Sequence, residues 1–117
     1  MGMSRQLPAR GDIWTIDLRT GRGSEQGGNR PALVIQNDIG NFHASTTIIA
    51  AITTTTRVFP VTVPLEKGEG GVRRKSMVNL SQILTVDQSR LKKKLGKLSS
   101  TRMSQVDEAA RISLALS

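Results

Sequence analysis

The chain of 117 residues contains no cysteine, one histidine, two phenylalanines, one tryptophan and no tyrosine. The absence of cysteine excludes a disulfide framework, a thiolate nucleophile and a cysteine-based zinc site, and it is compatible with a reducing cytoplasm. A single histidine excludes the pair of histidines with which many metal-independent nucleases exchange protons. Because aromatic residues make up only 3% of the chain, aliphatic side chains must build the core.

Long apolar runs are also missing from the sequence. No stretch approaches the roughly 18 consecutive apolar residues of a membrane-spanning helix, and the N-terminal residues have no apolar signal core. The length fits one domain of the commonest size. We therefore expect a cytoplasmic protein with a disordered N-terminal lead-in over residues 1–9 and a single domain over residues 10–117, without contact to a membrane.

Acidic residues are scarce relative to basic ones. The chain has 17 lysines and arginines against 9 acidic residues, a net charge of +8 and a pI of about 11.2. This surplus indicates a polyanionic partner, which is RNA, DNA or an acidic protein. An anionic membrane surface fits less well, because no basic amphipathic helix with bulky apolar residues is evident.

The basic residues gather in three groups, each either a solvated face or a phosphate-contacting patch. The groups are Arg73–Lys75, then Arg90 with Lys92–Lys94 and Lys97, and finally Arg19, Arg22 and Arg30.

Apolar and β-branched residues indicate several short strands. The strands are expected over residues 10–17, 32–36, 46–53, 57–65 (an edge or bent strand, because of Pro60 and Pro64) and 76–86 (two short strands with a kink). Residues 37–41 are all turn formers, and residues 91–98 fit either a helix or a charged edge strand. A helix capped by Ser99 or Ser100 should run to about Leu116. Five or more strands followed by one helix predict an α+β fold built on a small β-barrel.

A polar, glycine-rich loop over residues 19–30 delivers Arg30 to the start of the apolar strand 32–36. The guanidinium of arginine is always charged and matches a phosphate bidentately. Glycines let the backbone approach a ligand, and Pro31 stiffens the start of the strand. Such a loop suits an enzyme that acts on a phosphodiester, although a long hairpin loop with a solvated arginine has the same sequence pattern.

The other candidate groups offer little chemistry. His43 is expected in a loop between strands, where a lone histidine is usually solvated. Asp12, Asp17 and Asp38 do not have the spacing of metal ligands, and no phosphate-binding Gly-Lys-Ser/Thr loop occurs. We expect neither a metal ion nor a cofactor.

Several ordered motifs together resemble one family, the MazF/PemK toxins of bacterial toxin–antitoxin pairs. The resemblance extends from Arg10 to Leu116. The motifs are Arg10–Trp14 leading to Asp17 and Leu18, Gly23–Gly28 with Arg30 and Pro31, Leu33–Asp38, Ala50–Thr53, Leu80–Ile83 and Val106–Ala109. Several motifs in the family's order are far more specific than any one of them.

This resemblance implies a compact SH3-like barrel, also found in CcdB-like toxins, with a C-terminal helix and a homodimeric assembly. It implies a metal-independent endoribonuclease toxin that cleaves single-stranded RNA, chiefly mRNA, at a short sequence. Attack by the RNA 2′-hydroxyl would leave 2′,3′-cyclic phosphate and 5′-hydroxyl ends. A MazE-like antitoxin with an acidic, disordered tail would neutralise it.

The family's catalytic arginine falls on Arg30 and its catalytic threonine on Thr53. The positions that hold RNA in relatives fall on Ser24, Glu25, Gln26, Asn37 and Gln82, and Glu25 is also a candidate general base. Between Thr53 and Arg74 the chain follows no strong family pattern, so the cleavage sequence does not transfer. Two alternatives remain: a CcdB-like toxin that binds DNA gyrase and cuts nothing, and an inactive RNA-binding barrel.

Overall fold

The computed structural model of this protein describes residues 6–17, 29–54 and 59–116. Residues 1–5 of the expected lead-in lie outside the described residues. In chain order, the elements are β1 (Asp12–Asp17), β2 (Asn29–Val34), α1 (Asp38–His43), β3 (Thr46–Thr53), β4 (Thr62–Leu65), η1 (Glu69–Gly71), β5 (Ser76–Asp87), η2 (Gln88–Arg90), β6 (Leu91–Lys97) and α2 (Ser100–Ser113).

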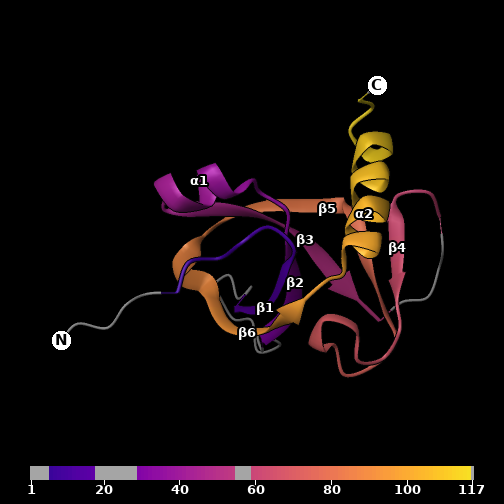
Figure 1. The fold of residues 1–117 in the computed structure, drawn as a ribbon, viewed down its shortest axis with the longest axis horizontal. Helices are drawn as coiled ribbons and strands as arrows, with labels where there is room; N and C mark the ends of the chain where they lie inside the picture. Colours follow the sequence, from indigo (N-terminus) through magenta and orange to yellow (C-terminus); the bar gives the residue numbers. More distant parts are fainter. Residues whose placement is uncertain (1–5, 18–28, 55–58, 117) are drawn as a thin grey trace, which may run out of the picture.

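The six strands form one antiparallel sheet in the order β4-β5-β3-β2-β1-β6, with α2 beside β4 and β5 (Figure 1). The edge positions fit the sequences of the outer strands, because β4 contains Pro64 and β6 contains four lysines. This arrangement confirms the α+β class and the C-terminal helix.

Alternation along the strands divides the core into two clusters, one on each face of the sheet. The first cluster, which includes residues of α2, consists of Ile13, Leu33, Ala50, Ile52, Val63, Leu65, Val72, Val78, Leu80, Leu98, Val106 and Ala109. The second consists of Trp14, Ile16, Ala32, Val34, Ile49 and Val86. Aliphatic residues dominate both clusters, as the composition predicts.

Helix α2 begins where the sequence predicts. The Ser99 hydroxyl accepts a hydrogen bond from the backbone N–H of Arg102 at 3.1 Å, which caps the first turn. Val106 and Ala109 bury the apolar face. The helix ends at Ser113, three residues before the predicted end, and the Ser113 hydroxyl donates to the Leu80 carbonyl at 2.6 Å.

The predicted turn over residues 37–41 is wrong, because residues 38–43 form the short helix α1. The Asn37 side chain accepts from the backbone N–H of Gly40 at 2.7 Å and caps this helix. The buried amide of Asn41 donates to the Gln36 carbonyl and accepts from the Thr47 hydroxyl at 2.6 Å. One helical turn held by side-chain contacts leaves no hydrophobic period in the sequence.

Several strands differ from their predicted limits, and β1 begins at Asp12 rather than at residue 10. Strand β2 begins at Asn29, so Arg30 and Pro31 lie inside the strand rather than in the loop before it. Residues 76–87 form one strand, β5, whose pairing with β3 shifts between Ala50 and Ala51 in place of the expected break. Strand β4 covers only Thr62–Leu65.

Residues 91–97 resolve the ambiguity between helix and strand in favour of the charged edge strand β6. This strand lies against η1, because glycines on both segments remove the side chains that would collide. A Cβ on Gly96 would lie 2.6 Å from the Gly70 carbonyl oxygen, and one on Gly71 would overlap the Leu95 carbonyl. Gly71 also has a φ of 90°, which favours glycine. The contact brings the chain that follows β4 onto the opposite edge of the sheet.

The substitution Gly96→Ala should lower the free energy of unfolding by about 1–3 kcal/mol, because the new methyl group meets backbone that has no room to move. Urea denaturation measures this loss. The exposed Lys92→Ala in the same strand is the control and should change stability by less than about 0.5 kcal/mol. Equal stability of the two variants would show that the glycine contact does not constrain the fold.

Candidate functional site

The register of strands β2 and β3 places Arg30 and Thr53 beyond the same end of their shared ladder. Ala32 pairs with Ala51, and Leu33 pairs with Ala50. The ladder ends at the Ala32–Ala51 pair, and Arg30 and Thr53 each lie two residues beyond it in their own strands. These residues are 23 positions apart in the sequence, and each lies at or next to the end of its strand.

Both side chains lie on the face of the second hydrophobic cluster. Arg30 pairs with the buried Ile16 of β1, so both side chains face the same side of the sheet. Thr53 lies four residues from the buried Ile49 in β3, and residues an even number apart in a strand share a face. Arg30 is exposed and Thr53 is half-buried. A cationic fork and a hydroxyl donor at the same end of an accessible face are suited to hold a phosphate group.

The remaining predicted site residues are distributed differently. Ser24, Glu25 and Gln26 lie outside the described residues. Asn37 lies beyond the other end of β2, where its side chain caps α1. The structure of one chain therefore does not bring Asn37 to the Arg30–Thr53 pair, and its role in RNA binding stays a prediction.

Gln82 lies at the irregularity of β5. Asn79 pairs with Ala51 and Ile83 pairs with Ala50, so residues 80–82 have no partner in β3. Gln82 is exposed and lies two residues before Leu84, on the same face of β5. Leu84 pairs with Ile49 of the second cluster. Gln82 therefore faces the same side of the sheet as Arg30 and Thr53, and a role in RNA binding stays a prediction.

His43 is the last residue of α1, and the prediction of a loop position is wrong. Its exposed ring contacts Phe42 edge to face at 4.9 Å between ring centroids. Asp12 is a structural carboxylate, since it is 1% exposed and its Oδ1 atom lies 3.4 Å from Lys94 and 3.3 Å from Lys97. Among the residues that the structure describes, no three His, Cys, Asp or Glu side chains form a metal-ligand cluster.

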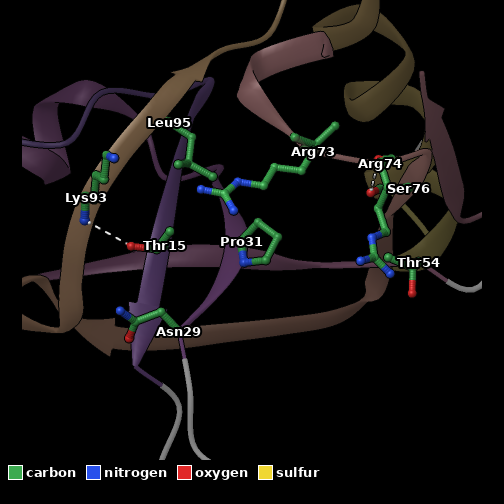
Figure 2. Close-up of a pocket in the computed structure, with 10 residues that line it drawn as sticks. Thr15, Asn29, Pro31, Thr54, Arg73, Arg74, Ser76, Lys93 and Leu95 are labelled. Atoms are coloured by element: carbon green, nitrogen blue, oxygen red, sulfur yellow. Dashed lines mark hydrogen bonds between the residues drawn. The ribbon is translucent and has the colours of Figure 1, made fainter. Parts of the chain in front are cut away.

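A pocket of about 370 Å³ lies between β1, β2, β6 and the segment after η1 (Figure 2). Its residues Asn29, Pro31 and Thr54 are sequence neighbours of Arg30 and Thr53, so it lies at the same end of the sheet. It lies on the opposite face of the sheet. Its residues Thr15 and Pro31 are two positions from Ile13 and Leu33 of the first cluster, respectively, and residues two apart in a strand face the same side. Its lining consists of Thr15, Asn29, Pro31, Thr54, Val72, Arg73, Arg74, Ser76, Lys93 and Leu95. Three of these residues are basic and none is acidic.

This pocket is absent from the sequence-based expectations. Arg73 and Arg74 belong to a recognisable basic run, but nothing in the local sequence shows that they face β1, β2 and β6. The signal that points to them is the glycine-rich segment 68–71 directly before the basic run, because glycines mark a close approach of backbone to a neighbouring element.

An ion pair fixes the segment that leads into the basic run. The Arg102 guanidinium of α2 donates to both carboxylate oxygens of Glu69 in η1, at 3.0 and 2.9 Å. The Glu69 carboxylate also accepts from the backbone N–H of Glu66 at 2.7 Å. These hydrogen bonds, that of Arg102 first, lower the pKa of Glu69 below its usual value, and the same pair raises the pKa of Arg102.

Comparison with known proteins identifies the family. The model of the PemK-like, MazF-like toxins of type II toxin–antitoxin systems matches residues 9–114. The chain belongs to this family.

Individual relatives agree with this assignment. The chain is 48% identical over 109 residues to endoribonuclease EndoA of Bacillus subtilis, covering 92% of this chain and 94% of the relative. An endoribonuclease in complex with its cognate antitoxin from a mycobacterial species superposes with a TM-score of 0.81 at 25% identity, covering 94% of this chain and 97% of the other. A MazE–MazF complex from Deinococcus radiodurans has the same fold, with a TM-score of 0.82 at 24% identity over 97% and 100% of the two chains.

No described helix is long and apolar enough to cross a membrane.

The Glu69–Arg102 pair predicts a pH dependence of stability. Because the folded pKa of Glu69 is lowered, its contribution is fully present above the ordinary value of 4.5 and is lost as the pH falls through the folded value. At pH 7, Glu69→Gln should lower the free energy of unfolding by about 1–2 kcal/mol. The difference from the parent protein should shrink as the pH falls below 4.5, as measured by urea denaturation across the pH range.

Glu108→Gln is the matched control, since Glu108 forms an exposed ion pair with Arg111 on the same helix at 3.2 Å. It should change stability by less than about 0.5 kcal/mol. A pH-independent loss in Glu69→Gln would contradict the ion-pair explanation.

Proposed function

We propose that this protein is a sequence-specific, metal-independent endoribonuclease toxin that acts on single-stranded RNA, mainly mRNA, in the cytoplasm. The observation that supports the proposal is the β2–β3 ladder, whose last paired residues, Ala32 and Ala51, lie two positions from the always-charged Arg30 and from Thr53. The net charge of +8 suits an RNA substrate. The 48% identity to an endoribonuclease supports the same activity.

The proposed reaction is an internal transesterification. The 2′-hydroxyl of a ribose loses its proton and its oxygen bonds to the adjacent phosphorus, while the bond from phosphorus to the 5′-oxygen of the next nucleotide breaks. That oxygen gains a proton, so the products are a 2′,3′-cyclic phosphate and a 5′-hydroxyl. No metal ion enters this scheme.

Arg30 and Thr53 have different roles in this scheme. Negative charge grows on the non-bridging phosphoryl oxygens as the new bond forms, and the Arg30 guanidinium stabilises it with two charge-assisted hydrogen bonds. Thr53 orients the phosphate or the attacking hydroxyl in line with the leaving oxygen. The guanidinium of arginine stays protonated in proteins and is therefore a poor proton acceptor. The proton therefore goes to Glu25 or to water.

Ser24, Gln26, Asn37 and Gln82 are proposed to hold the RNA on either side of the cleaved bond. Asn37 lies far from the Arg30–Thr53 pair along β2, so within this proposal it contacts a distant nucleotide or RNA bound mainly by the second chain of a homodimer.

The proposed regulator is a MazE-like antitoxin with an acidic tail that competes with RNA for the basic surface. The solved relative bound to its cognate antitoxin and the excess of basic residues support this partner. We also propose that residues 10–117 form one domain and that its sheet curls into an SH3-like barrel, because η1 after the edge strand β4 contacts the opposite edge strand β6.

Purified protein should cut a long single-stranded RNA at discrete sites in the presence of EDTA, leaving 2′,3′-cyclic phosphate ends that end mapping detects. Arg30→Ala should lower the cleavage rate by at least about a hundredfold, and Thr53→Ala by a comparable factor.

The controls remove equivalent groups elsewhere: Arg111→Ala on α2 and the exposed Thr85→Ala on β5. Both should cleave at the parent rate. Intact RNA after incubation with folded, antitoxin-binding protein would instead indicate a gyrase-binding toxin or an inactive RNA binder.

Glu25→Gln separates the two routes for the proton. If Glu25 is the general base, the substitution should lower kcat by about 10²–10⁴-fold and remove the acidic limb of the pH–rate profile. An unchanged kcat with a raised KM would assign Glu25 to RNA binding and leave water as the proton acceptor. Steady-state cleavage rates across the pH range measure both kcat and KM.

A further inference from the structure

We propose that the pocket between η1, β6 and the ends of β2 and β3 binds a nucleotide that flanks the cleaved bond in the RNA substrate. This inference rests on the proposed endoribonuclease function and adds a second binding position to it. The pocket's two arginines, Arg73 and Arg74, would hold the phosphate and the base of that nucleotide.

The position of the pocket follows from the strands that carry the catalytic pair. Asn29 and Pro31, which line the pocket, flank Arg30 in β2, and Thr54 directly follows Thr53. Successive residues of a strand face opposite sides of the sheet. The catalytic pair and the pocket therefore lie back to back at one end of the sheet, and an RNA strand that passes around this end meets both.

The chemistry of the pocket suits a nucleotide. Arg73 extends toward Thr15 and Pro31, and Arg74 extends toward Thr54 (Figure 2). Arginine binds phosphate bidentately, and its planar group stacks on bases. Pro31 contributes an apolar surface that a base can cover.

Both guanidinium groups are available to a ligand. No carboxylate lines the pocket. Across the described ranges, neither the Arg73 nor the Arg74 guanidinium has a hydrogen bond or an ion pair. Each is exposed at the rim. A bound phosphate would therefore gain two cations without first breaking an internal ion pair.

The polar groups beside the arginines already form some hydrogen bonds within the protein. The Thr15 hydroxyl accepts from the backbone N–H of Lys93 at 3.1 Å, which leaves its own hydrogen free to donate to a ligand. The Ser76 hydroxyl donates to the Arg74 carbonyl at 2.7 Å and holds the backbone of the basic segment. The exposed Asn29 amide offers both a donor and an acceptor to the edge of a base.

The segment that carries Arg73 and Arg74 is held in place by buried and hydrogen-bonded residues before it. Val72 is buried in the first cluster, directly before Arg73. The glycine contact with β6 and the Glu69–Arg102 pair fix the preceding residues. Its volume of about 370 Å³ lies at the lower end of the roughly 300–1,000 Å³ range of pockets that take small ligands.

An acidic peptide segment would also be attracted to this charge. The observations favour RNA because Asn29, Pro31 and Thr54 of the pocket are sequence neighbours of the catalytic pair, so a substrate already held at Arg30 places its neighbouring nucleotides within reach. An acidic peptide has no second group held at Arg30 that would direct it into the pocket.

The experiment compares two RNAs that share one cleavage site, a minimal oligonucleotide and one extended by several nucleotides on both sides. For the Arg73→Gln/Arg74→Gln double variant, we expect KM for the extended RNA to rise about tenfold with kcat unchanged. Kinetic constants for the minimal RNA should match the parent protein. The salt dependence of log(1/KM) for the extended RNA should also weaken, by about 0.7 for each phosphate that the variant no longer neutralises.

Arg111→Gln is a control for the loss of a positive charge elsewhere, because Arg111 lies on α2 and does not line the pocket, and it should leave KM unchanged for both RNAs. An equal fall in activity of the double variant on both RNAs would overturn the proposal, since it would reflect damage to the catalytic site or the fold. RNAs extended on one side at a time then show which flank occupies the pocket.

Two further outcomes separate this proposal from the proposed function. If the parent protein cleaves both RNAs and the double variant matches it on both, the flanking site is wrong while the endoribonuclease function stands. If the parent protein cleaves neither RNA, the endoribonuclease function fails and the flanking site fails with it. Unchanged RNA kinetics combined with weaker binding of an acidic antitoxin peptide would assign the pocket to protein instead.

Discussion

The contact between two glycine-bearing segments, η1 and β6, is the constraint on which much of this structure depends. Gly96 and Gly71 let two backbones approach more closely than any larger residue allows. As a result, the chain that leaves the edge strand β4 reaches the opposite edge strand β6 (Figure 1). The Glu69–Arg102 pair ties the same segment to α2. One crossing point therefore links both edges of the sheet and the C-terminal helix.

The same crossing connects the fold to the candidate site. It turns the basic segment after Val72 toward the strands that end near Arg30 and Thr53, and this creates the arginine-lined pocket. Two faces of a single sheet thus present positive charge at one end of the molecule. The guanidinium groups attract a polyanion to this end.

Much of the architecture could be predicted from local sequence. Strand β3 has the predicted limits, Thr46–Thr53, because β-branched and apolar residues fill it without interruption. The Ser99 cap and the spacing of Val106 and Ala109 place α2. Helix α1 was not predicted, because one helical turn, stabilised by the Asn37 cap and the buried Asn41, has no periodic signal. The catalytic roles of Arg30 and Thr53 are predicted from family resemblance, since no spacing within the chain links two residues 23 positions apart.

Residue types and short-range periodicity were enough to determine the strand-rich composition with one terminal helix, the positive charge and the absence of thiol chemistry. Tertiary interactions were needed to make residues 91–97 an edge strand, since only pairing with β1 distinguishes that strand from a helix of the same leucine spacing. The same holds for the position of Arg30 and Thr53 beyond one end of the β2–β3 ladder and for the pocket that Arg73 and Arg74 line. These placements depend on strand register and on a backbone contact between distant glycines, which are long-range interactions that no local pattern records.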